Sequence, residues 1–134
     1  MIGYIALIIL IVIILLIFSK NPKSMNLITI VSVLANISLT GYTLFTEKLP
    51  IYYFENSYIM ADYLGLYFTL IALVVFLFAM IYSQGYIQSL LETGQMKKYN
   101  ILLFYICSNL LLLTLLFSFF SNNLALFWIF IELT

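Results

Sequence analysis

Residues 63–82 read YLGLYFTLIALVVFLFAMIY, a run of twenty residues without a charged side chain. A run of this length is what an α-helix needs to cross the bilayer core, which is about 30 Å thick, at a rise of about 1.5 Å per residue. The rest of the chain has the same character, since 66% of the 134 residues are hydrophobic, 7% are charged and the mean hydropathy is +1.20. A water-soluble domain carries about 25% charged residues, so that class is excluded.

Three more complete apolar runs, and the beginning of another, predict helices of the same kind. The first run lacks the basic region and the small-residue cleavage site of a signal peptide, so we expect it to remain in the membrane. The sequence therefore predicts an all-α fold, a polytopic transmembrane helix bundle with four full spans and the first half of a fifth. These spans are expected at residues 2–18, 27–45, 63–82, 99–120 and 124–134.

The fifth run, residues 124–134, is too short to cross a bilayer. Its eleven residues extend only about 16 Å as a helix. A chain that ended there would leave its last carbonyls and its terminal carboxylate in hydrocarbon without hydrogen-bond partners. We therefore expect residues 1–134 to be the N-terminal transmembrane portion of a longer membrane subunit.

The distribution of lysines predicts the orientation of the chain. Lys20 and Lys23 lie between the first two runs, and Lys97 and Lys98 lie between the third and fourth, whereas Lys48 stands alone in the intervening loop. Because positive residues gather on the cytoplasmic side, the first and third loops are expected inside. The sequence thus predicts a multi-pass protein of the cell (inner) membrane with its N-terminus outside.

Several kinds of chemistry are excluded by the composition. The five basic residues are all lysines and the chain has no histidine, so it offers no basic face for nucleic acid and no histidine for metal binding or base catalysis. The single cysteine, Cys107, cannot form an internal disulfide or a Cys-x-x-Cys metal site, and we interpret it as a small hydrophobic residue. No metal site and no nucleic-acid partner are expected.

Two loops have patterns of their own. Residues 51–54 and 57–60 are β-prone on either side of Glu55-Asn56, which fits a hairpin, although an aromatic belt at the outer membrane interface is an equal alternative. Residues 85–92 alternate like an amphipathic helix lying on the inner membrane surface, and Gly94 is expected to end it.

Polar residues within the spans indicate which faces meet other helices, because lipid tails compete equally for apolar side chains. The second span carries a polar stripe at helical spacing, which serves either helix packing or a hydrated proton path. The third span has small residues on one side, and the fourth has Asn109, which fits helix packing or a hydrogen bond to a buried carboxyl. The residues are Thr29, Ser32, Asn36 and Thr40 in the second span, Gly65, Thr69, Ala72 and Ala79 in the third span, and Ser108, Asn109, Thr114 and Ser118 in the fourth span.

Glu132 is the only Asp, Glu, Lys or Arg inside any predicted span, about 12 Å from the start of its run. An ionised carboxylate at that depth costs at least a few kcal/mol unless it is paired, hydrated or protonated, which makes it a candidate functional residue. Such a group can bind and release a proton when a neighbour moves. Alternatively, Glu132 neutralises a buried lysine, bonds to backbone or lies near the interface. Trp128, one turn earlier on the same face, fits an interface anchor.

Residues 122–134, NNLALFWIFIELT, resemble the N-L-x-x-F-x-x-W/F-E-L-T-like segment of the antiporter-like, proton-conducting membrane subunits. These subunits occur in respiratory complex I, in formate hydrogenlyase and other membrane-bound hydrogenases, and in multi-subunit cation/proton antiporters. Residues 62–68, DYLGLYF, look like the D-x-x-G segment of this family, and residues 82–86, YSQGY, look like its Y-S-x-x-Y element. The resemblance covers about residues 60–134, and the first two spans agree in hydrophobicity and topology.

This resemblance implies a proton-translocating subunit of a redox-driven complex, either NADH:quinone oxidoreductase-like or hydrogenase-like, with a slight preference for the hydrogenase branch. It implies that Glu132 pairs with a lysine on a seventh span, beyond Thr134, so residues 1–134 alone are not expected to pump. Other membrane subunits of the complex would be the partners and would hold every redox cofactor. The alternatives are a cation/proton antiporter subunit and a small structural multi-span membrane protein.

Overall fold

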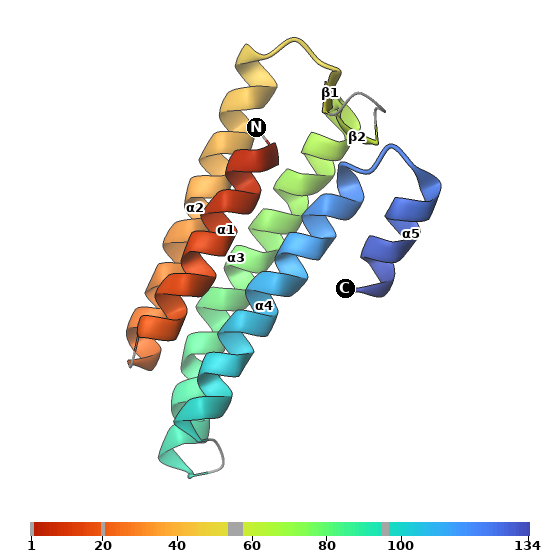
Figure 1. Ribbon diagram of the computed structural model, residues 1–134. Coiled ribbons are helices and arrows are strands. Elements are labelled where there is room, and N and C mark those ends of the chain that lie inside the picture. Colours follow the sequence, from red (N-terminus) through yellow and green to blue (C-terminus); the bar gives the residue numbers. More distant parts are fainter. Residues whose placement is uncertain (1, 20, 54–57, 95–96) are drawn as a thin grey trace.

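Four long helices lie side by side in a bundle, and a short fifth helix folds back beside one of them (Figure 1). The computed structural model describes residues 2–19, 21–53, 58–94 and 97–134. A small antiparallel sheet joins the second and third helices. The elements in chain order are α1 (Ile2–Phe18), α2 (Pro22–Thr46), β1 (Ile51–Tyr53), β2 (Ile59–Ala61), α3 (Tyr63–Glu92), α4 (Lys98–Phe119) and α5 (Leu124–Glu132).

Three of these helices are long and apolar enough to cross a membrane. They are α2 with 25 residues, α3 with 30 residues and the Tyr99–Phe119 part of α4 with 21 residues. The shorter α1 is also apolar and has 17 residues. The predicted fold is therefore confirmed in part: the chain is mostly helical and three of its helices could span a membrane, whereas four full spans and half of a fifth stay a prediction.

The second helix begins earlier than the predicted start at residue 27. Pro22 stands at its first turn, where the fixed φ of proline suits a helix and its missing N–H is not needed. The side chain of Asn21 caps this end by accepting a hydrogen bond from the backbone N–H of Lys23, at 3.2 Å. Local capping chemistry thus extends α2 beyond its apolar run.

The third helix corrects the prediction of a separate surface helix at residues 85–92. One continuous helix runs from Tyr63 to Glu92, and it is followed by Gly94 at a φ of 69°, a conformation that favours glycine. Ile87 is only 3% exposed and packs in a cluster with residues of α1, α2 and α4. The segment therefore extends the bundle, because its apolar side chains have helices to pack against.

The helices pack with a seven-residue repeat. Buried residues on α1 alternate at spacings of three and four, and α3 shows the same alternation across the half-buried Phe76. This average spacing of about 3.5 residues is typical of helices that pack with a left-handed crossing. The buried residues that follow this repeat are Ile2, Ile5, Ile9, Val12 and Leu16 on α1, and Leu66, Thr69, Leu73, Met80, Ser83 and Ile87 on α3.

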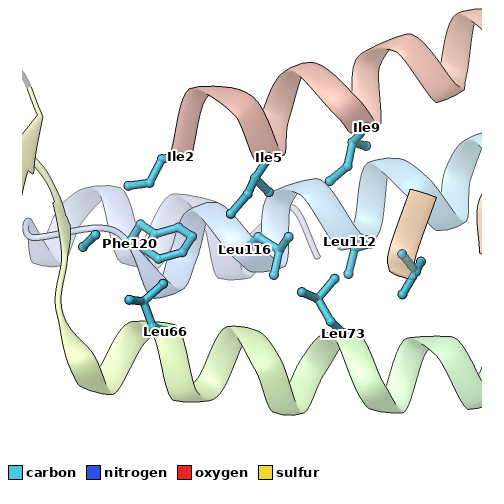
Figure 2. Close-up of a cluster of buried hydrophobic side chains, with 10 residues drawn as sticks. Ile2, Ile5, Ile9, Leu66, Leu73, Leu112, Leu116 and Phe120 are labelled. Carbon is cyan, nitrogen blue, oxygen red and sulfur yellow. The ribbon is translucent and has the colours of Figure 1, made fainter. Parts of the chain in front are cut away.

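One of two buried apolar clusters lies in the half of the bundle near the sheet, and the other lies in the opposite half; the second consists of Val12, Leu16, Met25, Met80, Ile87, Ile101 and Tyr105. Figure 2 shows the first cluster, with the isoleucines of α1 and the leucines of α3 pointing from opposite sides toward residues of α4. All of the residues in this cluster are at most 6% exposed, so neither lipid nor solvent reaches them. The labelled residues are Ile2, Ile5, Ile9, Leu66, Leu73, Leu112, Leu116 and Phe120.

The sheet confirms the antiparallel strand pairing of the predicted hairpin but not its register. The strands are Ile51–Tyr53 and Ile59–Ala61, and Ile51 pairs with Ala61 rather than with Met60, the partner that a two-residue turn at Glu55-Asn56 would require; the turn itself lies outside the described residues. The β2 segment also bonds to the connection between α4 and α5, since the N–H of Met60 donates to the carbonyl of Phe120 at 2.8 Å. The loops at this end of the bundle are therefore tied to each other.

Candidate functional site

Glu132 is the last residue of α5, and its carboxylate has a defined partner. The indole Nε1–H of Trp128 donates a hydrogen bond to Oε1 of Glu132, at 2.7 Å. The two side chains meet because residues four apart stack along one face of a helix, which agrees with the predicted shared face. Both residues are exposed, and Trp128 is 63% exposed. The bond holds the carboxylate at the surface of the helix.

The opposite face of α5 attaches the helix to α4. The rings of Phe130 and Phe117 stack with centroids 5.5 Å apart, and the hydroxyls of Thr134 and Thr114 lie 3.2 Å apart. Residues two apart in a helix point in nearly opposite directions, about 200° around the axis. Since Phe130 faces α4, Glu132 faces away from α4.

The contact with α4 also fixes how far α5 reaches along the bundle. Thr114 lies five residues before the end of α4 at Phe119, which corresponds to about 8 Å along the helix axis. The end of α5 lies level with Thr114, since Thr134 contacts this residue, and Figure 1 shows the C-terminus beside the middle part of the bundle. Measured along the bundle axis from the end of α4, the depth of the Glu132 carboxylate is therefore less than the roughly 12 Å that was counted along residues 124–132.

A second group of polar residues lies inside the bundle. Six polar side chains of α2 occur at every turn of its inner face, and all are at most 3% exposed. This confirms that the predicted stripe faces protein and adds Asn26 and Thr43 at its two ends. We call this group the polar column; it consists of Asn26, Thr29, Ser32, Asn36, Thr40 and Thr43.

Two amides connect the polar column to neighbouring helices. Nδ2 of Asn26 donates to Oε1 of Gln84 on α3 at 3.1 Å. Nδ2 of Asn109 on α4 donates to the carbonyl of Tyr105 at 2.8 Å and lies 3.5 Å from Oγ1 of Thr29. Asn109 therefore takes the packing role that was one of its two predicted alternatives.

The small-residue face predicted for α3 is confirmed in part and corrected in part. Gly65 and Thr69 are buried and Ala72 is half-buried, whereas Ala79 is exposed. The seven-residue repeat turns Met80 inward, so its neighbour Ala79 points about 100° away from the interface. On α4, Asn109 and Ser118 are buried, while Ser108 and Thr114 are half-buried and Cys107 is exposed.

The residues of the D-x-x-G segment have structural roles in this fold. A carboxylate oxygen of Asp62 accepts a hydrogen bond from the N–H of Gly65 at 2.7 Å and so caps α3. A Cβ atom at Gly65 would lie only 2.7 Å from the carbonyl oxygen of Phe119. Glycine is therefore required where the start of α3 crosses the end of α4.

The Y-S-x-x-Y element has a different environment. Ser83 is buried and its hydroxyl donates to the carbonyl of Met80 at 2.9 Å. Tyr82 and Tyr86 are 81% and 60% exposed. Between them, Gln84 accepts the hydrogen bond from Asn26, so this element contributes to the contact between α2 and α3.

Within residues 2–19, 21–53, 58–94 and 97–134, no group of three or more His, Cys, Asp or Glu side chains is placed to hold a metal ion. No family model, curated protein or solved structure matches the chain. Among the described residues, the candidate features are the Trp128–Glu132 pair on α5 and the polar column inside the bundle.

Proposed function

We propose that this chain is part of an antiporter-like, proton-translocating membrane subunit in which Glu132 carries the transferred proton. The observation that supports this most directly is the position of Glu132 on the face of α5 that points away from α4. Its carboxylate is bound by one indole N–H and is otherwise open to a neighbouring helix. A carboxylate in a membrane-embedded helix is a functional candidate because of its energetic cost there.

Trp128 gives this carboxylate a fixed geometry without neutralising it. A neutral indole N–H stabilises the ionised oxygen by hydrogen bonding but supplies no positive charge. The opposing cation must then come from a helix that packs on the outer face of α5. This matches the Glu–Lys pair that the family resemblance implies, and it makes the protonation of Glu132 sensitive to movement of that lysine.

In the proposed arrangement, α1 to α4 are four full spans and α5 is the first half of a fifth. The 17 residues of α1 extend about 26 Å, close to the thickness of the bilayer core. The N-terminus lies outside, because the turns after α1 and α3 carry the lysines. The subunit belongs to the cell (inner) membrane, and its partners are other membrane subunits of a redox-driven complex, which hold all redox cofactors.

One set of observations favours a second candidate, a structural multi-span protein. Thr29, Asn36, Thr40 and Thr43 all donate to backbone carbonyls of their own helix. The Asp62–Gly65 pair also has a purely structural explanation. In this alternative, the polar residues serve packing and Glu132 is a surface residue at the edge of the membrane.

The substitution Glu132→Gln separates the two candidates. We expect proton transfer to be abolished or strongly reduced in the intact complex reconstituted in vesicles, because glutamine keeps the shape and hydrogen bonding of glutamate but cannot release a proton. Proton movement is measured with a pH-sensitive dye inside the vesicles. Assembly is checked by the amount of complex recovered, which should not change.

Glu92→Gln is a matched control. Glu92 also ends a helix and also accepts a hydrogen bond from a side chain four residues earlier, Gln88, at 3.2 Å. It follows the apolar run of α3, so its substitution should leave proton transfer unchanged.

Proton transfer at the wild-type rate in Glu132→Gln would refute the proposed role of the Glu132 carboxylate. Transfer driven by an imposed ion gradient, with no response to electron donors, would support the antiporter branch instead.

A further inference from the structure

Five buried side-chain oxygen atoms inside the bundle have no hydrogen-bond partner within the described part of the chain. Three belong to the polar column of α2, one to α3 and one to α4. Each atom is almost completely inaccessible. They are Oδ1 of Asn26, Oγ of Ser32, Oδ1 of Asn36, Oγ1 of Thr69 and Oδ1 of Asn109.

Four of these oxygen atoms follow one another along the axis of α2. Asn26, Ser32 and Asn36 lie on its inner face, and Asn109 lies level with Thr29 because the two side chains meet at 3.5 Å. Counting the rise of the helix, the unpaired oxygens of Asn26, Asn109, Ser32 and Asn36 are separated by about 4.5, 4.5 and 6 Å along the axis. A water molecule that donates to two oxygens spans at most about 5.6 Å, since each bond is about 2.8 Å long, so one molecule can bridge each of the first two gaps and two molecules can bridge the third.

The partner must be small and polar. Lipid and other protein chains cannot reach these oxygens, because α1, α3 and α4 surround the inner face of α2 and Asn36 and Asn109 are 0% exposed. Buried polar atoms in proteins almost always have a partner, and where the protein supplies none, ordered water usually does. Each unpaired oxygen can accept from a water O–H.

A cavity at one end of the polar column provides the entrance. It has a volume of about 270 Å³ and lies between the start of α2, the end of α3 and the start of α4. Gln84 lines this cavity and also accepts the hydrogen bond from Asn26, the first residue of the polar column. The other polar lining residues are Asn21, Lys23, Gln88, Glu92 and Tyr105.

The opposite end is closed by the apolar core. Thr69 lies between Leu66 and Leu73 on α3, and both leucines are 0% exposed. Beyond them the interior is filled by the cluster that Figure 2 shows, which includes Ile2, Leu116 and Phe120. A cavity therefore lies at the Gln84 end of the polar column, beside the apolar cluster that contains Met25, Ile87 and Tyr105, whereas the end near the sheet is packed with apolar side chains.

We propose that the polar column binds a file of ordered water molecules that enters from the Gln84 cavity and bridges the unpaired oxygens of Asn26, Asn109, Ser32 and Asn36. This water site is separate from Glu132 and does not depend on the proposed role of that residue. It provides a hydrated path from one face of the membrane into the middle of the bundle.

Solid-state NMR of the full protein in lipid bilayers tests this proposal. Magnetisation is transferred from water protons to the side-chain amides of Asn36 and Asn109, which are far from the bulk solvent. We expect rapid transfer to both amides and none to the methyl groups of Leu66, which is 0% exposed and lies near the sheet, beyond the proposed water sites. Absence of transfer to both amides in the wild-type protein would overturn the proposal.

Two serine substitutions on α2 sharpen the test. Ser32→Ala removes an unpaired buried hydroxyl, whereas Ser38→Ala removes an exposed hydroxyl that bonds to the carbonyl of Ala35 at 2.8 Å. Transfer to Asn36 should be lost in Ser32→Ala and retained in Ser38→Ala, because Ser32 connects the water near Asn109 to that near Asn36, whereas transfer to Asn109, which lies nearer the entrance, should be retained in both variants. Equal transfer to Asn36 in both variants would exclude a bridged file. Circular dichroism and the emission of Trp128 verify that both variants keep the fold.

Discussion

The four-helix bundle and α5 have similar apolar compositions, but polar side chains are buried in the bundle and exposed on α5. The bundle encloses the polar column of α2 and Asn109 of α4 among its helices. In α5, none of the nine residues, all of them described, is buried, and Glu132 points away from α4. The role of a polar residue in a span therefore depends on whether neighbouring helices surround it.

The hydrogen bond that each carboxylate accepts within its own helix does not distinguish the candidate residue Glu132 from the control residue Glu92. Glu132 and Glu92 each accept from a donor four residues earlier, at 2.7 and 3.2 Å. What differs is the helix face around them, because α5 packs mainly on α4 and its outer face has no neighbour among the described residues. The proposed function of Glu132 rests on that open face.

Substitution of a core leucine should have the largest effect on the stability of the bundle. Leu73→Ala is expected to destabilise the fold by about 2–5 kcal/mol, because Leu73 is 0% exposed and its removal leaves a cavity between helices. The free energy of unfolding is measured by denaturant titration in mild detergent. Ile71→Ala is the control, since Ile71 is 60% exposed and detergent or lipid refills the space. Equal losses would mean that the assigned inner face of α3 is wrong.

The crossing of α3 and α4 should be sensitive to a single methyl group. Gly65→Ala is expected to destabilise the protein by about 1–3 kcal/mol, because the new Cβ would lie 2.7 Å from the carbonyl oxygen of Phe119 and 2.8 Å from the capping oxygen of Asp62. Gly85→Ala adds the same group on the same helix with no atom within 4 Å. This control should stabilise the helix by about 0.5–1 kcal/mol. The same denaturant titration measures both variants, and a neutral Gly65→Ala would contradict the close approach.

The smallest effect is expected where α5 meets α4. Phe130→Ala removes a stacked pair and should weaken this contact by about 0.5–1.5 kcal/mol without unfolding the bundle. Trp128, the single tryptophan, reports the change through its emission spectrum, while circular dichroism remains constant. Ile129→Ala, at a site that is 51% exposed, should leave the emission unchanged. Loss of helicity in Phe130→Ala would show that α5 and the bundle form one cooperative unit.

Much of the candidate site was accessible from the sequence, for an identifiable reason. The polar stripe of α2 stands out in an apolar helix, and its burial follows because hydrogen-bonding groups are unfavourable against lipid. Likewise, Glu132 is conspicuous as a charge in an apolar run. Two residues were missed, since Asn26 and Thr43 fall at the edges of the run although they continue the same spacing.

The remaining features required contacts between distant segments. The pairing of Met60 with Phe120 joins residues 60 positions apart, and no local pattern indicates it. The continuation of α3 to Glu92 was also missed, because the alternating pattern of residues 85–92 fits a helix on the membrane surface as well as a helix end packed in a bundle. In this case the neighbouring helices decide between the two.

The sequence alone determined that the chain forms apolar helices, where most of them begin and end, and which face of α2 lies inside. Its charge-free runs and capping residues are local features, and these fix local structure. Only the tertiary structure decided which face of α1 is buried, how the buried face of α3 continues beyond Ala72, and that Glu132 faces away from α4. The reason is physical: in a helix that is apolar all round, lipid and protein interior are equally favourable environments, so shape complementarity between helices selects the face.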